Sequence, residues 1–507
     1  MVLARVFTST VVGIEGLLVE VEVDVSNGLP TFAIVGLANE EVKESRDRVR
    51  AALKNCGFDF PAKRIVVNLA PATVRKGGGS FDLPIAVGLA VASGQVAQKG
   101  APHYLLLGEL SLDGALKGVR GALSMVSGVG DGRVEGVILP HVNAQEASVA
   151  TSRPVYGART LGEVLEIVSG AVLPRAAEPG QAGAPSGGTD GVDFAEVRGQ
   201  EHAKRAIEVA AAGGHNILLA GPPGSGKTMI ARRIPTILPP MTVAEAIETT
   251  KIFSVAGLLP GDGLLVRRPF RAPHHSISDV ALVGGTQVPR PGEVTLANHG
   301  VLFLDEFTEF RRSALEVLRQ PLEDRVVTIA RAHSTVTFPA NFMLVAAMNP
   351  CPCGNLTDPK KQCRCSTGDI DRYRRKISGP LLDRIDIHIE VPPARYSEIA
   401  GDGAGEPSAA IRERVARARE TQRRRFADCP GVFANSQMSP RHLREFCGLD
   451  AASRNLLKAA TARLGLSARS YTKVLKVART IADLDAAATI EARHVAEAIQ
   501  YRTSQVA

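Results

Sequence analysis

The first third of the chain alternates between two hydrophobic periods, one typical of strands and one typical of helices. Residues 17–25, LLVEVEVDV, place apolar and acidic side chains alternately, which predicts a strand with one face in water. Residues 40–55 carry apolar positions at helical spacing, and residues 80–94 predict an apolar helix that ends at glycine. A short apolar run at residues 64–71 predicts a buried strand. This mixture predicts an α+β domain over residues 1–170.

The rest of the chain divides into a linker and two further regions. Residues 171–191 are rich in proline, glycine and alanine without apolar periodicity, which is typical of a flexible linker. Residues 192–395 alternate strand and helix patterns and predict an α/β domain. Residues 407–507 have helical spacing almost throughout and predict an all-α domain. A chain of 507 residues is long enough for several such domains, each with its own core.

The strongest motif lies in the α/β region, where the apolar run NILLA leads into GPPGSGKT and then into the helical stretch MIARRI. This strand–loop–helix context indicates a P-loop, whose glycines let backbone N–H groups turn toward phosphates. Lys227 would supply positive charge to the β- and γ-phosphates, and the Thr228 hydroxyl would reach Mg²⁺. The predicted nucleotide-binding residues are Gly221, Pro222, Pro223, Gly224, Ser225, Gly226, Lys227 and Thr228.

Two further apolar runs end in polar side chains that suit nucleotide hydrolysis. The run GVLFLDEF ends in Asp305 and Glu306, and the run ANFMLVAAMNP ends in Asn349. We expect Asp305 to help hold Mg²⁺ and Glu306 to orient and polarise the water that attacks the γ-phosphate. Asn349 would reach the same water or the γ-phosphate.

Two arginines follow in the order that an ATPase assembled from several subunits requires. Arg384 comes after SGPLLD and before the strand pattern IDIHIEV, where a cation can face a phosphate in a neighbouring subunit. Arg469 lies at the start of the helical pattern ARSYTKVLKVARTIADL. Either arginine alone is also compatible with an ordinary surface position, so their order is the more informative observation.

The order of P-loop, Asp-Glu strand, Asn strand, LLDR and arginine-bearing helical lid resembles the plan of AAA+ ATPases. The stretches RAPHHSISDVALVGG, PRPGEVTLANHGVLFLDE, AAMNPCPCG and SGPLLDRIDI resemble the magnesium-chelatase-like branch, and within it the YifB/ComM family. The resemblance implies that Asn349 is the sensor 1 residue, Arg384 the arginine finger and Arg469 the sensor 2 residue. It also implies a homo-hexameric ring with ATP at the subunit interfaces. Members of the ComM type are DNA helicases that drive branch migration during natural transformation.

The first region resembles the C-terminal domain of Lon proteases, a fold of the ribosomal S5 domain 2 type, through GGGSFDLPIAVGLA and LLLGELSLDGALKGVRGALSMV. Those enzymes use a serine nucleophile that a lysine within hydrogen-bond reach activates. Ser80 falls near the nucleophile position, but Met125 falls at the lysine position, and a thioether cannot accept its proton. Lys117 is expected about two helical turns away, which is too far to substitute easily. We therefore expect a proteolytically inactive domain, in which Ser80 could equally cap a helix.

The net charge of +8 is concentrated at the C-terminal end of the chain. Residues 407–507 hold 18 Lys and Arg against 9 Asp and Glu, a net of +9, so the remainder is close to neutral. A basic end domain suggests a polyanionic partner such as DNA, although a solvated helical surface has the same pattern. The sequence contains no apolar run long enough to span a bilayer and no secretory signal pattern, so we expect a cytoplasmic protein.

Two segments of the α/β region could grip DNA as hairpins. EDRVVTIARAHSTVTFPANF has two strand-like halves, with Arg331 and His333 near the tip, and ALVGGTQVPRPGEVTL predicts a second hairpin with Arg290 in its turn. Cationic tips suit phosphates without reading sequence, although exposed turns with incidental charge would look the same. The neighbouring pair His274-His275 is expected to be a packed or turn pair, since no partner ligand is visible.

Four of the seven cysteines lie in the single loop CPCGNLTDPKKQCRC, which runs from Asn349 toward the Arg384 segment. Cys351, Cys353, Cys363 and Cys365 could bind Zn²⁺ with four thiolates. The Cys-x-Cys spacing is tighter than the commoner Cys-x2-Cys, and free thiols are the main alternative. A disulfide within Cys-x-Cys would be strained, and a reducing cytoplasm disfavours it. A bound ion would stiffen a loop that has little core of its own.

The patterns predict a Mg²⁺-dependent NTPase with a basic helical lid, and the family resemblance implies an AAA+ ATPase that forms a hexameric ring and moves along DNA, acting in branch migration. One rival is a chelatase motor that serves insertion of a metal into a porphyrin. That family's motor works with a partner subunit that carries a metal-binding fold, and no such fold is visible in this chain. The other rival is a protein remodeller or protease, which Met125 disfavours.

Overall fold

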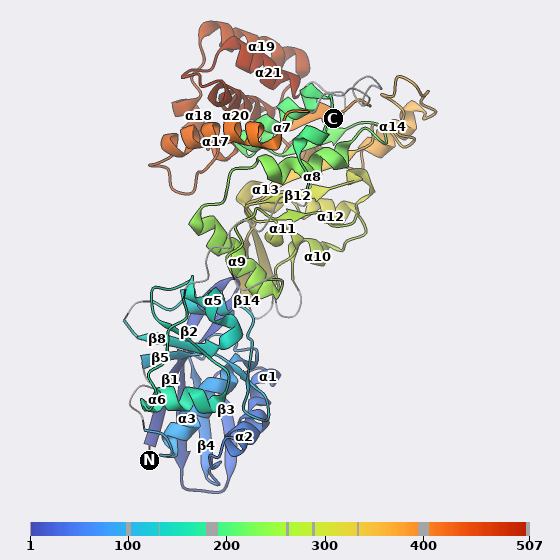
Figure 1. Cartoon of the computed structure of the whole chain (residues 1–507). Coiled ribbons are helices and arrows are strands. Elements are labelled where there is room, and N and C mark those ends of the chain that lie inside the picture. Colours follow the sequence, from blue (N-terminus) through green and yellow to red (C-terminus); the bar gives the residue numbers. More distant parts are fainter. Residues whose placement is uncertain are drawn as a thin grey trace. The chain divides into compact units, whose positions relative to one another are not determined.

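The structure, a computed structural model, divides the chain into two compact units (Figure 1). Unit 1 comprises residues 1–184 and 243–266, and unit 2 comprises residues 185–242 and 267–507. The segment 243–266, which the sequence pattern had grouped with the α/β region, thus packs with the first unit. Most of the expected linker lies outside the described residues. The structure describes residues 2–97, 103–130, 132–178, 191–259, 263–285, 289–331, 334–393 and 405–502.

Unit 1 is built on a seven-stranded mixed sheet with the order β3-β4-β2-β1-β5-β8-β9. The alternating segment forms β2, in which Val19, Val21 and Val23 are buried while the acidic residues between them are only partly covered. This confirms the expected strand with one wet face. The strands are β1 (Val2–Val12), β2 (Glu15–Ser26), β3 (Thr31–Val35), β4 (Arg64–Ala70), β5 (Tyr104–Leu106), β8 (Gly136–Pro140) and β9 (Val155–Ala158).

Helices cover this sheet, and one of them comes from far along the chain. Every residue of α3 (Asp82–Ala92) is buried, as its apolar sequence requires. Helix α9 (Val243–Ala256) belongs to unit 1 because it packs on α4 (Ala122–Ser127). Its Ser254 hydroxyl donates a 2.5 Å hydrogen bond to Glu146, and Lys251 pairs with Glu15 at 2.8 Å. The other helices are α1 (Glu40–Lys43), α2 (Ser45–Asn55), α5 (Ala144–Ser148) and α6 (Leu161–Ser169).

The region that resembles a protease holds a buried serine without a nearby lysine partner among the described contacts. Ser80 lies in a short 3-10 turn before α3, and its hydroxyl makes no hydrogen bond to any described residue. Met125 is buried on α4. Lys117 lies in the two-residue strand β7 (Leu116–Lys117), opposite Glu109 of β6 (Glu109–Leu110), so the expectation that it lies on a helix is wrong. Loss of peptidase activity stays a prediction.

Unit 2 contains a five-stranded sheet with the order β11-β12-β15-β10-β16, and all its pairings are parallel. The residues of β10, β12 and β15 are buried throughout, which explains why they read as continuous apolar runs. Parallel strands place all their carboxyl ends at one edge, where ligands bind in such folds. The strands are β10 (Ile217–Ala220), β11 (Phe270–Arg271), β12 (Val301–Leu304), β15 (Met343–Met348) and β16 (Ile387–Glu390).

The C-terminal region is helical, as expected, and its helices gather together in Figure 1. Two of them pack on α7 (Glu201–Gly213), so one hydrophobic core runs from the sheet into the helical region. These helices are α17 (Ser408–Arg425), α18 (Pro440–Phe446), α19 (Ala451–Leu464), α20 (Ala468–Leu484) and α21 (Ala492–Gln500). Around the sheet lie α8 (Lys227–Ile237), α10 (Asp279–Val283), α11 (Glu293–Leu296), α12 (Arg312–Glu316), α13 (Arg319–Asp324), α14 (Thr367–Arg374) and α15 (Gly379–Leu382). Among the residues described, no helix combines the length and apolar character needed to cross a membrane.

One of the two expected hairpins is present and the other is not. Strands β13 (Val326–Arg331) and β14 (Ser334–Pro339) pair antiparallel up to Arg331 and Ser334, which confirms the first hairpin. His333 lies outside the described residues. The prediction of a second hairpin around Arg290 is wrong for the described residues, which leave out 286–288: its expected strand arms are the helices α10 and α11, and a single bridge joins Gly284 and Pro291 between them. Proline cannot donate to a strand ladder, which disfavours strands in this segment.

Candidate nucleotide-binding site and its surroundings

The predicted nucleotide-binding residues meet at the carboxyl edge of the unit 2 sheet. The P-loop follows β10, Asp305 and Glu306 follow β12, and Asn349 follows β15. Strand β15 lies between β10 and β12, so these three segments are adjacent in space as well as in register. The sheet therefore assembles residues from positions 221 to 349 into one site.

The P-loop needs glycine at particular positions for two different reasons. Gly224 and Gly226 have φ values of +78° and +84°, in the left-handed region that side chains rarely adopt. Gly221 has a different requirement, because a β-carbon there would lie 2.2 Å from the carbonyl oxygen of Val391 after β16. The loop is thus held tightly against the end of β16 while its own glycines curve it, as a phosphate-binding loop requires.

Lys227 lies inside this loop and is mostly buried. Its ammonium group donates to the carbonyl oxygens of Gly221 at 2.7 Å and Pro222 at 3.0 Å, and it lies 3.4 Å from the side-chain oxygen of Asn349. Burial lowers the pKa of Lys227, and the negative charge of Asp305 opposes that shift. The structure therefore brings Lys227, Asn349 and Asp305 to one place, as the sequence predicts.

The residues next to Lys227 suit a hydrated magnesium ion. The Thr228 hydroxyl donates a 2.6 Å hydrogen bond to Asp305, so the two oxygens that a metal would share already lie side by side. A hydroxyl and a carboxylate are hard oxygen ligands, which Mg²⁺ prefers while it keeps several waters and binds substrate phosphates. Thr228 and Asp305 thus fit the ion, which would neutralise charge on the phosphates when bound.

Glu306 has a partner that sequence reasoning missed. Its carboxylate lies 3.0 Å from Nδ1 of His275, and its backbone adopts a left-handed conformation with φ of +51°. Such strained non-glycine residues cluster at functional sites. The rings of His274 and His275 lie 4.1 Å apart, which agrees with the expected packed pair, and the contact of His275 with Glu306 comes in addition. His275 follows β11, whose two residues are too few to show a strand period.

Gln200 is a second residue that the motif search missed. It precedes α7 with a left-handed φ of +56°, and its side-chain amide donates to the carbonyl oxygens of Ser225 at 2.8 Å and Pro392 at 2.9 Å. These two bonds tie the P-loop to the segment after β16. The sequence signal that could have pointed to Gln200 was the pair Gly199-Gln200 directly before the helix.

The four clustered cysteines come together as a possible metal site. The sulfur of Cys351 lies 3.4 Å from that of Cys353 and 3.7 Å from that of Cys363, and Cys353 and Cys363 are 3.6 Å apart. With Cys365, all four sulfurs lie within 4.8 Å of one another. A tetrahedral zinc ion with bonds of 2.3 Å requires sulfur separations of about 3.8 Å. The cluster thus has the donor chemistry and nearly the spacing of a Zn²⁺ site, and none of these cysteines forms a disulfide.

The thiol of Cys353 has a lowered pKa, which favours the thiolate form. Backbone N–H groups of Arg364 and Asn355 hydrogen bond the sulfur of Cys353 and lower its pKa to about 6. Burial has the opposite effect on Cys351 and raises the pKa of its thiol. Because the thiolate is the form that binds zinc, Cys353 is the member best suited to start ion binding.

The two predicted arginines meet at a single carboxylate. Arg384 lies between α15 and β16, and Arg469 lies in the first turn of α20. Both guanidinium groups bind Glu323 of α13, Arg469 at 3.2 Å and Arg384 through a direct ion pair. Among the described residues, no contact joins either arginine to the P-loop of the same chain. The structure thus brings the two arginines to one carboxylate, and their roles in hydrolysis stay predictions.

The two cationic loops also meet, although only one is a hairpin. A β-carbon on Gly285 would lie 3.4 Å from a guanidinium nitrogen of Arg331, and one on Gly284 would lie 3.4 Å from Ile329. The Gly285 N–H donates to the carbonyl oxygen of Arg290. Arg290 and Arg331 are both exposed. The loop between α10 and α11 therefore packs against the end of the β13–β14 hairpin and adds a second cation there.

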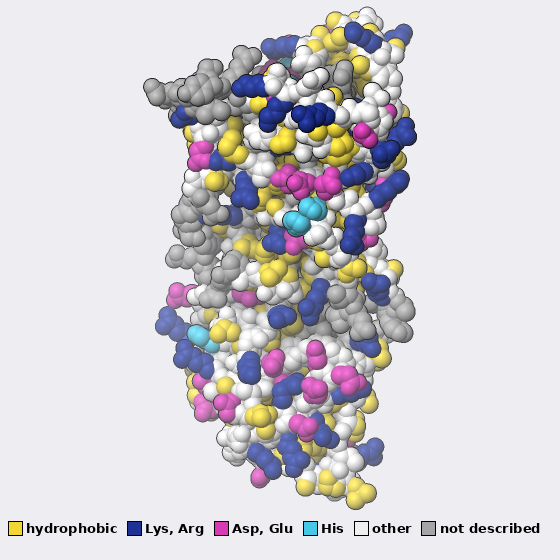
Figure 2. Space-filling model, turned by 90° about the vertical axis from the view of Figure 1, so that its right-hand side faces the viewer, with side chains coloured by type: hydrophobic (Ala, Val, Ile, Leu, Met, Phe, Trp, Pro, Cys, Tyr) yellow, Lys and Arg dark blue, Asp and Glu magenta, His cyan; other side chains and the backbone are white. Residues whose placement is uncertain are grey.

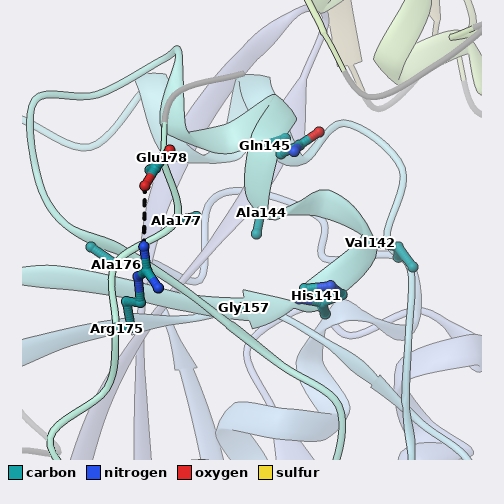
Figure 3. Close-up of a pocket in the computed structure, with 9 residues that line it drawn as sticks. All are labelled: His141, Val142, Ala144, Gln145, Gly157, Arg175, Ala176, Ala177 and Glu178. Atoms are coloured by element: carbon teal, nitrogen blue, oxygen red, sulfur yellow. Dashed lines mark hydrogen bonds and ion pairs between the residues drawn. The ribbon is translucent and has the colours of Figure 1, made fainter. Parts of the chain in front are cut away.

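Unit 1 has a separate cavity of about 540 Å³, drawn in Figure 3. Its polar side chains are His141, Gln145, Arg175 and Glu178, and Arg175 is already paired with Glu178 at 3.2 Å. Both members of that pair are almost fully exposed. A ligand site needs several polar groups that converge inside a largely apolar enclosure, and this cavity does not supply them.

The sheet order, the P-loop and the acids that follow the neighbouring strand define a P-loop nucleotide-hydrolase core with a helical lid. The sequence matches the family model "Magnesium chelatase, subunit ChlI" over residues 193–399. It also matches "Subunit ChlI of Mg-chelatase" over residues 21–143 and "Magnesium chelatase, subunit ChlI C-terminal" over residues 405–502. The chain belongs to the YifB/ComM family of magnesium-chelatase-like AAA+ proteins.

Relatives of the family align over nearly the whole chain. Competence protein ComM of Haemophilus influenzae is 44% identical over 505 residues, which cover 99% of this chain and 98% of that protein. Uncharacterized protein YifB of Escherichia coli is 41% identical over 512 residues, covering 99% and 97%. Two shorter similarities involve Lon protease 2 of Bacillus subtilis, 27% identical over 34% of this chain, and probable DNA helicase MCM9 of Arabidopsis thaliana, 25% identical over 40% of it.

Proposed function

We propose that this protein is a Mg²⁺-dependent ATPase that forms a homo-hexameric ring and translocates along single-stranded or branched DNA, promoting branch migration in natural transformation or recombination. The observation that carries the DNA assignment is the packing of the Arg331 hairpin against the Arg290 loop at one place in the AAA+ unit. Family membership implies the ATPase. The names of two relatives, a competence protein and a probable DNA helicase, favour DNA over other polymers.

In this proposal each residue of the site has a distinct role in hydrolysis. Lys227 and the P-loop N–H groups bind the phosphates, while Thr228 and Asp305 hold Mg²⁺. Glu306 orients the attacking water, and Asn349 lies close enough to Lys227 to contact the γ-phosphate from the neighbouring strand. Arg384 and Arg469 stabilise the transition-state charge on a phosphate bound by the adjacent subunit.

DNA contact in this proposal depends on a few protruding cations. On the face drawn in Figure 2, Lys and Arg side chains are interspersed with Asp and Glu, so that face carries no continuous basic surface. Arg331 and Arg290 would instead contact the phosphates of DNA inside the ring, and His333, which lies outside the described residues, stays a further candidate. Phosphate contacts of this kind give salt-dependent affinity with little sequence preference.

We also propose that the four cysteines hold one structural Zn²⁺. The chemistry of the donors and the sulfur separations support this assignment. In the cytoplasm, where we expect this protein, the thiols stay reduced and available to metal. The ion would stiffen the loop that follows Asn349, which helps to keep that side chain near the γ-phosphate.

The experiment that tests the function compares stimulators of ATP hydrolysis. Branched DNA, unfolded protein and a porphyrin with its metal are each added to the purified protein, and phosphate release is measured. We expect stimulation by DNA alone, with a steep loss as salt rises. Arg331→Ala should reduce DNA-stimulated hydrolysis more than basal hydrolysis. The matched control is Arg372→Ala, which removes another exposed arginine from α14 of the same unit. Stimulation by protein or porphyrin instead of DNA would reject the proposal.

A further inference from the structure

Among the residues that the structure describes, Glu323 is the one that contacts both arginines predicted to act on phosphate. Its two carboxylate oxygens accept from different guanidinium groups, one from Arg384 and one from Arg469. The partners lie 61 and 146 residues away along the chain, in the core and in the helical lid. A lone carboxylate between two arginines has the charge and the oxygen geometry of the phosphate that such a pair binds.

The contact is accessible enough to be exchanged for another anion. The side chain of Arg384 is 10% exposed, whereas those of Glu323 and Arg469 are 50% and 55% exposed. The hydrogen bond from Arg384 lowers the pKa of Glu323, so its carboxylate is charged near neutral pH. Two guanidinium groups held together repel each other unless an anion lies between them. A γ-phosphate that presents more oxygens and more charge can therefore replace Glu323.

A buried ion pair fixes the elements that carry the two arginines. Asp386, two residues after Arg384, pairs with Lys473 at 2.8 Å, and Lys473 lies one helical turn after Arg469 on α20. Burial alone would raise the pKa of Asp386, but the Lys473 ammonium lowers it far below its usual range. Breaking one partner of such a buried pair is costly, so the core and the lid present their arginines as one unit.

Glu323 also lies next to the proposed DNA-gripping hairpin. It is on α13, which ends at Asp324, and β13 begins at Val326. The residue between them, Arg325, has a left-handed φ of +57° and closes the helix. Only Asp324 and Arg325 therefore separate Glu323 from the first residue of the hairpin, so a displacement of the hairpin would act directly beside the Glu323 carboxylate.

We propose that Glu323 competes with the γ-phosphate of ATP on a neighbouring subunit for Arg384 and Arg469, and that movement of the β13–β14 hairpin releases the two arginines. Glu323 thereby limits hydrolysis until DNA engages the hairpin. The inference rests on the proposed function, because it takes from it that Arg384 and Arg469 act on ATP bound by a neighbouring subunit; the competition for the two arginines, however, does not require DNA.

The first experiment measures ATP hydrolysis without DNA. Glu323→Gln keeps the shape of the side chain but removes its charge, so the arginines become available to phosphate. We expect the DNA-independent kcat to rise about fivefold, which corresponds to about 1 kcal/mol from losing the two ion pairs of the half-exposed Glu323 carboxylate. Glu316→Gln is the matched control, because Glu316 pairs with Arg319 at 3.1 Å and, among the described contacts, forms no ion pair with Arg384 or Arg469. A fall in kcat for Glu323→Gln, with nucleotide binding retained, would overturn the competition.

The second experiment measures the ratio of DNA-stimulated to DNA-independent hydrolysis. We expect the ratio to fall close to one in Glu323→Gln and to be kept in Glu316→Gln and partly in Glu323→Asp. An unchanged ratio in Glu323→Gln would refute the link to the hairpin. If the unsubstituted protein itself shows no stimulation by DNA, the proposed function fails, and the DNA-free arm still decides whether Glu323 restrains the arginines. Thermal unfolding of each variant verifies that the fold is kept.

Discussion

Gly354 lies against Pro223, so the cysteine loop and the P-loop are in direct contact. A β-carbon added to Gly354 would lie 2.6 Å from Cδ and 2.8 Å from Cγ of Pro223. Gly354 follows Cys353 directly and closes a turn through its N–H bond to the carbonyl oxygen of Cys351. The cysteine loop thus packs directly on the predicted phosphate-binding loop.

Gly354→Ala should weaken ATP binding. The new methyl group must displace Pro223, and it also enters a left-handed conformation with φ of +80°. We expect the Kd for ATP to rise about fivefold, corresponding to about 1 kcal/mol of distortion in the P-loop. Isothermal titration with a non-hydrolysable ATP analogue measures the change.

A control for Gly354→Ala separates the effect of backbone strain from the effect of the contact with Pro223. Gly431 has nearly the same φ, +77°, but a β-carbon there would meet no atom within 4 Å. Gly431→Ala should therefore carry the strain of the left-handed region without a change in Kd. Equal Kd values for both variants would show that the Pro223 contact does not transmit distortion.

Substitutions of Lys227 and of Glu306 should impair different steps, nucleotide binding for Lys227 and ATP hydrolysis for Glu306. Lys227→Ala should abolish nucleotide binding, because Lys227 is buried within the phosphate-binding loop. Glu306→Gln should keep binding but lower kcat by a factor of about 100 or more, since it acts on the attacking water. His275→Ala should lower kcat less, because it only orients the Glu306 carboxylate at 3.0 Å. Normal turnover by Glu306→Gln would remove that residue from the catalytic role.

Arg384 should act on ATP held by a neighbouring subunit. Rings of Arg384→Ala or of Lys227→Ala subunits should each be inactive, whereas mixed rings should regain part of the activity because some interfaces pair an intact P-loop with an intact arginine. ATP hydrolysis measured across mixing ratios tests this. Unmixed Arg384→Ala rings that hydrolyse ATP at the normal rate would contradict the assignment.

Local motifs predicted the centre of the site because their chemistry is encoded over a few residues. The P-loop, Asp305 and Asn349 each follow a buried strand, and parallel pairing of those strands brings them together. Gln200, His275 and Glu323 gave no comparable signal. They meet their partners only through tertiary packing, and β11 before His275 has just two residues.

In the fold, too, the local sequence pattern predicted individual elements but not how segments far apart in the chain pack together. The strand period of β2 and the apolar character of α3 were sufficient to predict those elements. The sequence of α9 could not show that it packs on α4 of unit 1, because its docking partners lie more than a hundred residues earlier. The loop at Arg290 resembled a hairpin because glycine and proline mark turns of many kinds.

The cysteine cluster should hold about one Zn²⁺ per chain. Protein prepared without chelator is analysed for metal beside the double variant Cys363→Ser/Cys365→Ser, which keeps only two of the four sulfurs. We expect the variant to lose the metal and to show weaker ATP hydrolysis or ring assembly. Cys447→Ser is the control, since this buried cysteine lies in the helical region and outside the cluster. Metal-free protein before substitution would reject the site.

His388 should make unit 2 less stable in mild acid. Burial first, and then the positive charges of Arg502 and Lys473, lower the pKa of His388 to about 3, whereas a histidine in an unfolded chain has a pKa of about 6.5. Between these values the unfolded chain binds one more proton than the folded chain. The stabilisation is therefore complete above pH 6.5 and declines by about 1.4 kcal/mol per pH unit as the pH falls toward 3.

The measurement is urea unfolding followed by circular dichroism at several values between pH 7.5 and 4.5. His388→Gln keeps a hydrogen-bond acceptor near Arg502, whose Nη1 lies 3.4 Å from Nε2 of His388, but it cannot bind the extra proton. We expect the free energy of unfolding of this variant to fall less steeply below pH 6.5, because the contribution of one histidine, about 1.4 kcal/mol per pH unit, is removed. His202→Gln, at an exposed position of the same unit, should keep the full slope. Burial lowers the pKa of His215 as well, so part of the decline of unfolding free energy with falling pH should remain in His388→Gln. If the decline in His388→Gln equalled that of the unsubstituted protein, His388 would have to take up its proton in the folded protein.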